Sequence, residues 1–221
     1  MSQTNYAVVQ ARIASLCREL QRPLPRLLAV TKGRAAADIA QLAALGQREF
    51  GENFLSELHA KADQLAHLAI DWVFIGVLQS NKIKHIVRLC CEIQTLASFK
   101  HARYVDRYAS DFGKSPYPVY LAVNISAEPQ KQGIAPAQVE YLAARIAAEC
   151  QHLALQGIMA IPPAKYCDAD YRTSLPLPYR RLQALKQNCG NGKLSLGMSA
   201  DLRLALLAAT DTVRIGRSLF V

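Results

Sequence analysis

Residues 119–161 read VYLAVNISAEPQKQGIAPAQVEYLAARIAAECQHLALQGIMAI, and this segment contains the repeating unit that decides the fold. It begins with one apolar run, Val119 to Asn124, and ends with another, Leu155 to Ile161. Between the two runs, apolar residues recur at the i, i+3, i+4, i+7 spacing of one helix face: Val139, Leu142, Ala143 and Ile146. A strand, a helix and a second strand in this order predict a βαβ unit with parallel strands.

The same alternation extends over most of the chain. Short apolar runs of the kind found in parallel strands covered on both faces occur eight times: Leu27 to Thr31, Glu49 to Gly51, Trp72 to Gly76, Glu92 to Leu96, Val119 to Asn124, Leu155 to Ile161, Leu194 to Met198 and Thr212 to Gly216. The steps between them are roughly 26 residues, enough for one strand, one helix and two short loops. These units favour an α/β fold, a closed (β/α)8 TIM barrel, over an open sheet.

The two ends of the chain are expected to complete the ring of helices. The chain stops at Val221, directly after the eighth run, so we expect no eighth helix there. An additional helix precedes the first run and has one apolar face, formed by Val9, Ile13, Leu16 and Leu20. We predict that this N-terminal helix takes the place of the last one. Because the eight units use the whole length, residues 1–221 are expected to form a single domain.

Composition and charge exclude several classes of function. Hydrophobic residues make up 51% and charged residues 19% of the 221 residues, which is the balance of a chain that buries a core. With no apolar stretch of about 18 residues and no signal peptide, we expect a cytoplasmic protein without a membrane segment. The 26 Lys and Arg exceed the 17 Asp and Glu by +9 but are scattered. We therefore expect attraction for small phosphate esters and no specific nucleic-acid partner.

Lys32 is the first candidate for chemistry. Active sites of barrels lie at the C-terminal ends of the strands, and Lys32 directly follows the first apolar run. We expect burial to desolvate an amine in this position, which favours the neutral form that attacks an aldehyde. Lys32 is therefore a candidate Schiff-base lysine. The alternative is a lysine that extends into solvent.

The last two apolar runs predict a phosphate site. Loops after strands seven and eight of a barrel commonly hold a phosphate on backbone N–H groups. Ser199 follows the seventh run and could donate its hydroxyl to the phosphate. The alternative is a Ser199 that only caps the next helix, and the two roles can coexist. Gly216 would let the backbone approach closely. Closure of the barrel would place these two loops, which would form a cup for the phosphate, next to Lys32. An amine beside a phosphate cup indicates an aldehyde that carries a phosphate, and pyridoxal 5′-phosphate (PLP) is the commonest such cofactor.

Seven segments resemble, in order and spacing, the pyridoxal phosphate homeostasis protein family: LLAVTK (27–32), QREFGENFLSEL (47–58), WVFIGVLQSNKIK (72–84), VNISAEPQKQGI (123–134), GIMAIPP (157–163), LSLGMSADL (194–202) and VRIGRSLF (213–220). The resemblance covers essentially the whole chain. It implies a barrel of the alanine racemase N-terminal type that holds PLP as an internal aldimine and has no established turnover. The expected function is a carrier that buffers PLP and supplies it to PLP-dependent apo-enzymes.

The resemblance also implies roles for individual residues around the cofactor. Lys32 resembles the Schiff-base lysine of the family. Arg214 matches the arginine near the pyridine nitrogen, where a cation disfavours protonation of the ring and weakens its electron sink. Asn53 matches a polar residue beside the ring. Lys131 matches a second basic site near the mouth of the barrel, with an exposed loop lysine as the alternative.

For the phosphate, the resemblance assigns Ser199, Gly216 and the backbone of Arg217 to the cup. The chain departs from the family here, since Arg217-Ser218 stands where Thr-Ala is usual. Arg217 is therefore expected either to bind the phosphate through its own charge or to point away. Val73 stands where His is usual, and the chain ends at Val221 where the family continues. These departures concern the affinity for PLP more than its identity.

Two other functions remain open. One is a small PLP-dependent amino-acid racemase or lyase with a base from the barrel itself, for which Tyr166 and Tyr171 are the nominees. Both lie in the loop 162–178, which either covers the open end of the barrel or is disordered. The other is an aldolase-like barrel that forms its Schiff base with a sugar phosphate. We place the carrier first because the length leaves no room for a racemase's second domain, and we expect a monomer.

Overall fold

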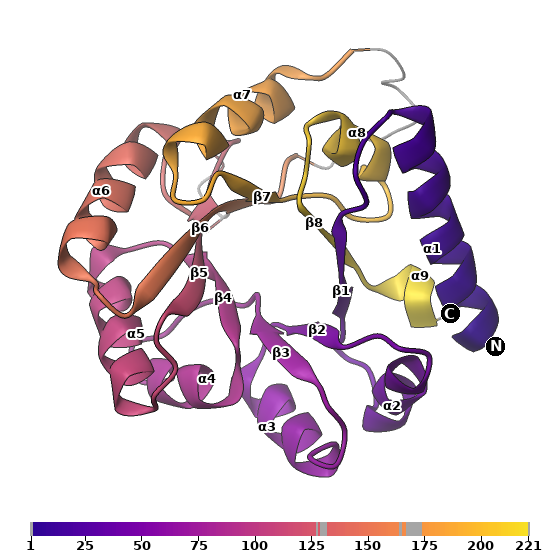
Figure 1. Ribbon diagram of the computed structural model, residues 1–221, viewed down its shortest axis with the longest axis horizontal. Helices are drawn as coiled ribbons and strands as arrows, with labels where there is room; N and C mark the ends of the chain where they lie inside the picture. Colours follow the sequence, from indigo (N-terminus) through magenta and orange to yellow (C-terminus); the bar gives the residue numbers. More distant parts are fainter. Residues whose placement is uncertain (1, 127, 129–131, 164, 167–173, 221) are drawn as a thin grey trace.

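The computed structural model describes residues 2–126, 128, 132–163, 165–166 and 174–220. Its strands are parallel and close into a barrel in chain order, with the last strand paired to the first (Figure 1). They are β1 (Arg26–Val30), β2 (Glu49–Glu52), β3 (Asp71–Phe74), β4 (Glu92–Leu96), β5 (Tyr117–Val123), β6 (Leu153–Ala160), β7 (Lys193–Ser195) and β8 (Thr212–Ile215). Each overlaps one of the apolar runs, so the predicted (β/α)8 barrel is confirmed.

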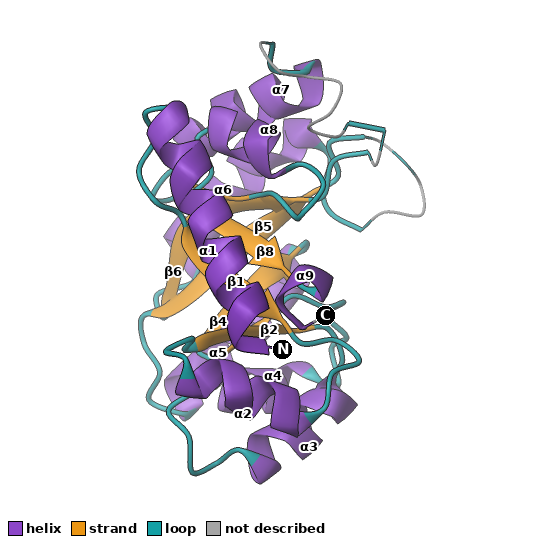
Figure 2. Ribbon diagram, turned by 90° about the vertical axis from the view of Figure 1, so that its right-hand side faces the viewer, coloured by secondary structure: helices purple, strands orange, loops and turns teal. Residues whose placement is uncertain are grey.

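Helices surround the strands, as the side view in Figure 2 also shows. They are α1 (Ser2–Glu19), α2 (Ala36–Ala44), α3 (Leu55–Gln64), α4 (Ile83–Leu89), α5 (Phe99–Asp111), α6 (Val139–Glu149), α7 (Leu177–Leu185), α8 (Leu202–Leu207) and α9 (Arg217–Phe220), with 3-10 turns η1 (Pro136–Gln138) and η2 (Lys186–Asn188). The predicted apolar face of α6 is buried against the barrel. Among the described residues, no helix has the length and apolar character needed to cross a membrane.

The N-terminal helix closes the ring of helices, as predicted. Val9 and Ile13 of α1 are buried, and Leu16 and Leu20 pack against the core. Helix α1 lies beside α2 and α9 (Figure 1). The prediction that no helix follows the eighth strand is wrong, because Arg217–Phe220 forms the short helix α9. One turn is enough to bury Leu219 completely.

Two boundaries differ from the sequence prediction and both affect the mouth of the barrel. Strand β7 ends at Ser195 rather than Met198. Leu196 and Gly197 still hydrogen-bond to β8, and the φ of +103° at Gly197 ends the extended conformation there. Helix α7 begins at Leu177, inside the predicted loop 162–178, with a proline in its first turn. Residues 164 and 167–173 of that loop lie outside the described part of the chain.

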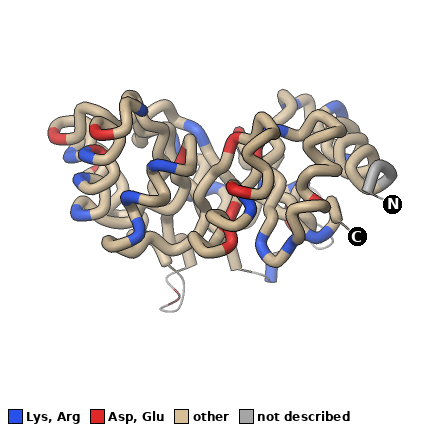
Figure 3. Tube along the Cα trace, turned by 90° about the horizontal axis from the view of Figure 1, so that it is seen from below, with Lys and Arg blue, Asp and Glu red and all other residues tan. Residues whose placement is uncertain are grey.

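Charged residues are spread over the molecule. In the view of Figure 3, Lys and Arg positions occur on both halves of the chain trace. This distribution agrees with the scattered basic residues of the sequence.

Candidate functional site

Lys32 follows β1 at the C-terminal end of the barrel. Its side chain is exposed, and its Nζ lies 5.3 Å from the centre of the Phe54 ring. The expected desolvation of the amine is therefore wrong for this structure. Strand β1 ends at Val30, and the chain turns through Gly33, which has a φ of +67°, so Lys32 stands outside the sheet.

A cluster of charged side chains contacts the backbone on either side of Lys32. Lys61 Nζ forms ion pairs with Glu52 Oε2 and Glu57 Oε2, both at 2.6 Å, and donates a hydrogen bond to the carbonyl of Thr31 at 2.8 Å. Glu52 is fully buried and also accepts a hydrogen bond from the Thr31 hydroxyl at 2.8 Å. We call Glu52, Glu57 and Lys61 the Lys61 cluster.

The Lys61 cluster holds the chain on both sides of Lys32. Glu57 accepts a hydrogen bond from the Gly33 N–H at 2.9 Å, while Lys61 holds the preceding carbonyl. The hydrogen bond that Glu57 accepts from Lys61 lowers the pKa of Glu57, and the bond from the Gly33 N–H acts in the same direction. Partial burial of Glu57 opposes this shift. Glu52 also accepts from the N–H of Asn53 at 2.7 Å. The same cluster therefore fixes the turn that holds Lys32 after β1 and the backbone of Asn53 after β2.

The ends of β7 and β8 bring two hydroxyls together. Ser199 Oγ and Ser218 Oγ lie 2.8 Å apart. The loop before Ser199 is fixed by Asp201, whose carboxylate accepts from Met198 N–H at 2.7 Å and from Tyr179 OH at 2.8 Å. Asp201, not Ser199, occupies the N-cap position of α8. The capping alternative for Ser199 is therefore wrong, and its hydroxyl remains available at the mouth.

The phosphate candidates adjoin the Lys32 turn, as predicted for a closed barrel. Strand β8 pairs with β1 in a register that sets Ile215 opposite Ala29, so Gly216 lies against Val30. Arg217 follows as an exposed side chain at the start of α9. The amine of Lys32 and the Ser199–Ser218 pair thus belong to adjacent strand ends, which is the arrangement needed for a ligand with both an aldehyde and a phosphate.

Arg214 points into the barrel interior and is buried. Its Nη1 donates to Ser195 Oγ at 2.7 Å and its Nη2 donates to the Ala160 carbonyl at 2.8 Å. Burial lowers the pKa of Arg214 to about 10, against the opposing effect of the Asp201 carboxylate. The guanidinium therefore remains a cation at neutral pH.

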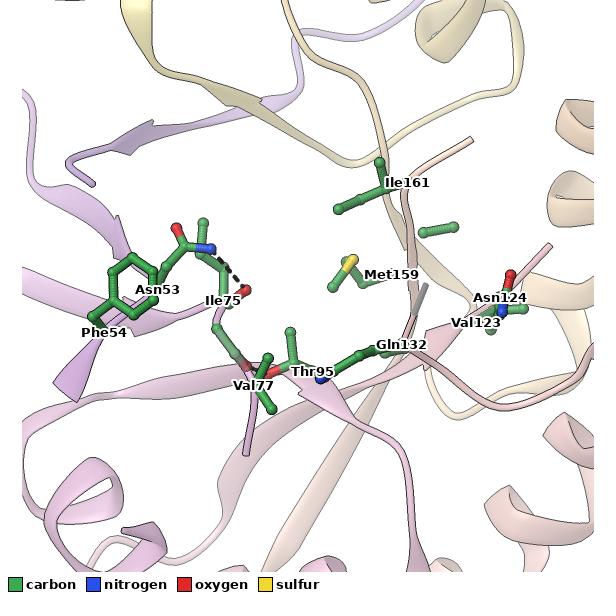
Figure 4. Close-up of a pocket in the computed structure, with 13 residues that line it drawn as sticks. Asn53, Phe54, Ile75, Val77, Thr95, Val123, Asn124, Gln132, Met159 and Ile161 are labelled. Carbon is green, nitrogen blue, oxygen red and sulfur yellow. Dashed lines mark hydrogen bonds between the residues drawn. The ribbon is translucent and has the colours of Figure 1, made fainter. Parts of the chain in front are cut away.

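A pocket of about 400 Å³, which we call the mouth pocket, opens at the C-terminal ends of β2 to β6 (Figure 4). Its walls are mostly apolar and include Asn53, Ile75, Val77, Val123, Met159 and Ile161. Asn53 turns its side-chain nitrogen to the Ile75 carbonyl at 3.5 Å. Of the predicted site residues that the structure describes, Asn53 alone lines this pocket. Arg214 lies next to the pocket, because its Nη2 donates to the carbonyl of Ala160, and Ala160 is one of the residues that line the pocket.

Comparison with known proteins identifies the family. No protein-family model matches the chain. The pyridoxal phosphate homeostasis protein of Pseudomonas aeruginosa is 36% identical over 220 residues, which cover 98% of this chain and 93% of the relative. The chain belongs to the pyridoxal phosphate homeostasis protein family. The relative from Caenorhabditis elegans is also 36% identical, over 207 residues that cover 88% of this chain and 84% of its own.

Two solved structures resemble the barrel of this member of the pyridoxal phosphate homeostasis family. PipY of Synechococcus elongatus PCC7942, with PLP bound, has a TM-score of 0.77 and 29% identity, and the match covers 95% of this chain and 100% of PipY. Alanine racemase of Clostridium difficile 630 has a TM-score of 0.68 at 13% identity. That match covers 95% of this chain and 55% of the racemase, and it shows a shared barrel fold alone.

Four further residues named in the sequence analysis are Lys131, Tyr166, Tyr171 and Val73. Lys131 and Tyr171 are outside the described residues. Tyr166 packs edge-on against Tyr179, with 6.2 Å between ring centres. Val73, where the family usually has His, is fully buried in β3.

Sequence reasoning missed Ser218 as a partner of Ser199, and it missed the Lys61 cluster. Glu57 and Lys61 are four residues apart on α3, and this ion-pair spacing was visible in the sequence. Their contact with the Lys32 turn depends on the packing of α3 beside β2, which no local pattern reports.

Gly76 offers a test of how tightly the mouth is packed. A Cβ at this position would lie 1.8 Å from the carbonyl oxygen of Asn53. We expect Gly76→Ala to displace the Asn53 backbone and to lower the free energy of unfolding by about 1–3 kcal/mol, as overpacking does. Urea unfolding measures this change. Gly216→Ala is the stability control, because its Cβ would meet Val30 at an ordinary 3.5 Å. Equal unfolding midpoints for the two variants would contradict the expected clash.

Proposed function

We propose that this chain binds PLP reversibly through Lys32 and acts in PLP homeostasis as a cytoplasmic, monomeric carrier without catalytic turnover. The observation that supports this most is the juxtaposition of an exposed amine after β1 with paired hydroxyls after β7 and β8. Membership in a family named for PLP homeostasis points the same way, as does the PLP bound to PipY.

The side chains present fit a phosphorylated aldehyde. PLP supplies an aldehyde that condenses reversibly with a primary amine. Lys32 would provide that amine, and Ser199 and Ser218, with the backbone at Gly216 and Arg217, would bind the phosphate. Arg214 would remain charged near the ring nitrogen. A cation in that place disfavours protonation of the ring and so weakens the electron sink that amino-acid chemistry requires.

The mouth pocket supports a carrier over a racemase or lyase. Among the described residues that line it there is no Asp, Glu, His, Lys, Tyr or Cys, so this part of the wall offers no strong general base beside the ring. Tyr166, the described nominee for that role, packs against another tyrosine. The exposed position of Lys32 instead leaves its bond to PLP open to water and to competing amines. We propose that PLP-dependent apo-enzymes are the recipients.

Two assays separate the carrier from an enzyme. The PLP-loaded protein, incubated with amino acids in heavy water, is expected to exchange their α-hydrogens no faster than an equal amount of free PLP. The same loaded protein, freed of unbound PLP, is expected to restore the activity of a PLP-dependent apo-enzyme. NMR measures the exchange and the recipient's own assay measures the transfer. Sustained exchange over many turnovers would show an enzyme instead.

A further inference from the structure

A chain of hydrogen bonds crosses the barrel interior from Arg214 to a carboxylate. Arg214 Nη1 donates to Ser195 Oγ at 2.7 Å, and the Ser195 hydroxyl donates to Gln94 Oε1 at 2.7 Å. Gln94 Nε2 then donates to Glu92 Oε1, also at 2.7 Å. Ser195 and Gln94 are fully buried, and the two charged ends are at most 6% exposed. We call these four residues, from β8, β7 and β4, the Arg214 relay.

Elementary chemistry fixes the direction of every bond in the relay. A guanidinium only donates hydrogen bonds, and a carboxylate only accepts them. Gln94 must therefore present its amide nitrogen to Glu92, because the reverse orientation would bring two acceptor oxygens together. The amide oxygen then faces Ser195, whose hydroxyl must donate to it while accepting from Arg214. All donors point from the cation toward the anion.

This one-way order strengthens the hold on Arg214. In a low-dielectric interior, a hydroxyl that donates a hydrogen bond becomes a better acceptor, so Gln94 improves the bond from Arg214 to Ser195. The second terminal nitrogen of Arg214 is held by the carbonyl of Ala160 in the wall of the mouth pocket. The guanidinium is therefore fixed from two sides.

The relay also links Arg214 to a charge of opposite sign. Glu92 is balanced at its other oxygen by Arg26, at 2.7 Å. The Asp201 carboxylate acts on Arg214 from the mouth side, and it accepts hydrogen bonds from the Met198 N–H and the Tyr179 hydroxyl. Replacing Ser195 or Gln94 removes none of these charges. Such variants therefore test the hydrogen-bonded connection between Arg214 and Glu92, with every charge kept.

We propose that Ser195 and Gln94 are positioning residues that fix Arg214 at the wall of the mouth pocket and thereby set how readily the ring nitrogen of bound PLP takes up a proton. This inference rests on the proposed function. Neither residue needs to touch the cofactor. Both act through the place and charge of Arg214.

The test is a pH titration of the visible absorption of the PLP-loaded protein. In Ser195→Ala and Gln94→Leu, the guanidinium loses its anchor, and we expect the proton affinity of the ring nitrogen to rise roughly ten-fold, one pKa unit. Gln47→Leu is the matched control for Gln94→Leu. Gln47 is a buried amide outside the relay, and its side-chain nitrogen donates to the carbonyls of Leu27 and Glu49. Circular dichroism confirms that each variant folds.

Wild-type pH dependence in both folded, PLP-bound relay variants would overturn the proposal. A shift in Ser195→Ala alone would overturn the role of Gln94. A second arm needs no PLP: phenylglyoxal should modify Arg214 several-fold faster in both relay variants than in the wild type, as mapped by mass spectrometry. Equal rates would also overturn the proposal. If the wild type takes up no PLP, the proposed function fails, and the labelling arm still decides whether the relay anchors Arg214.

Discussion

A Lys32→Ala variant is expected to lose all covalently held PLP and to keep its fold. The amine is the group on which the covalent bond depends, and removing it leaves only the phosphate and ring contacts. The side chain contributes little to stability, because it is exposed and packs over the Phe54 ring, a contact worth about 0.5–1 kcal/mol at such sites. Absorption spectra of the protein titrated with PLP measure the loss.

Lys84→Ala is the matched control for this experiment. Lys84 is another exposed lysine, on α4, and its removal should leave both the spectrum and the unfolding midpoint unchanged. Retention of the covalent PLP spectrum in Lys32→Ala would show that a different lysine carries the cofactor.

A Lys61→Met variant is expected to be strongly destabilised. Removing Lys61 leaves Glu52 fully buried without its counter-charge, and breaking a buried pair in this way typically costs about 3–5 kcal/mol. Glu57 contributes less, since it is partly exposed and water can solvate it. The carbonyl of Thr31 also loses one of its two donors and keeps the Arg34 N–H. Urea unfolding should show a much lower midpoint, and the folded fraction should bind PLP more weakly because the Lys32 turn is loosened.

The double variant Lys61→Met, Glu52→Gln distinguishes the lost charge balance from the lost volume. Neutralising the orphaned carboxylate should recover part of the stability, whereas Lys84→Met on the surface should change it by less than about 0.5 kcal/mol. A Lys61→Met midpoint equal to that of Lys84→Met would contradict the structural role of the Lys61 cluster.

The strands and their order could be predicted from the sequence because each strand is an apolar run of distinctive length. The end of β7 could not, since the apolar run continues to Met198 while the positive φ of Gly197 ends the extended conformation. Helix α9 was missed for a similar reason, because a single turn leaves no periodic pattern.

Part of the site could also be predicted, because the closed barrel brings strand ends together. Lys32, Ser199 and Gly216 were placed at the mouth by this rule alone. The sequence left open whether Lys32 is desolvated or extends into solvent, because this depends on where β1 ends. Ser195 and Gln94 are separated by 101 residues and meet only across the finished barrel. Contacts of that range carry no signal in a single sequence.

The position of the covalent bond shows whether Lys32 carries PLP. The protein is incubated with PLP, reduced with borohydride to make any imine permanent, digested, and mapped by mass spectrometry. We expect a single dominant phosphopyridoxyl group on Lys32, absent from Lys32→Ala. Modification centred on any other lysine, or none above the level of an unrelated lysine-rich protein, would contradict it.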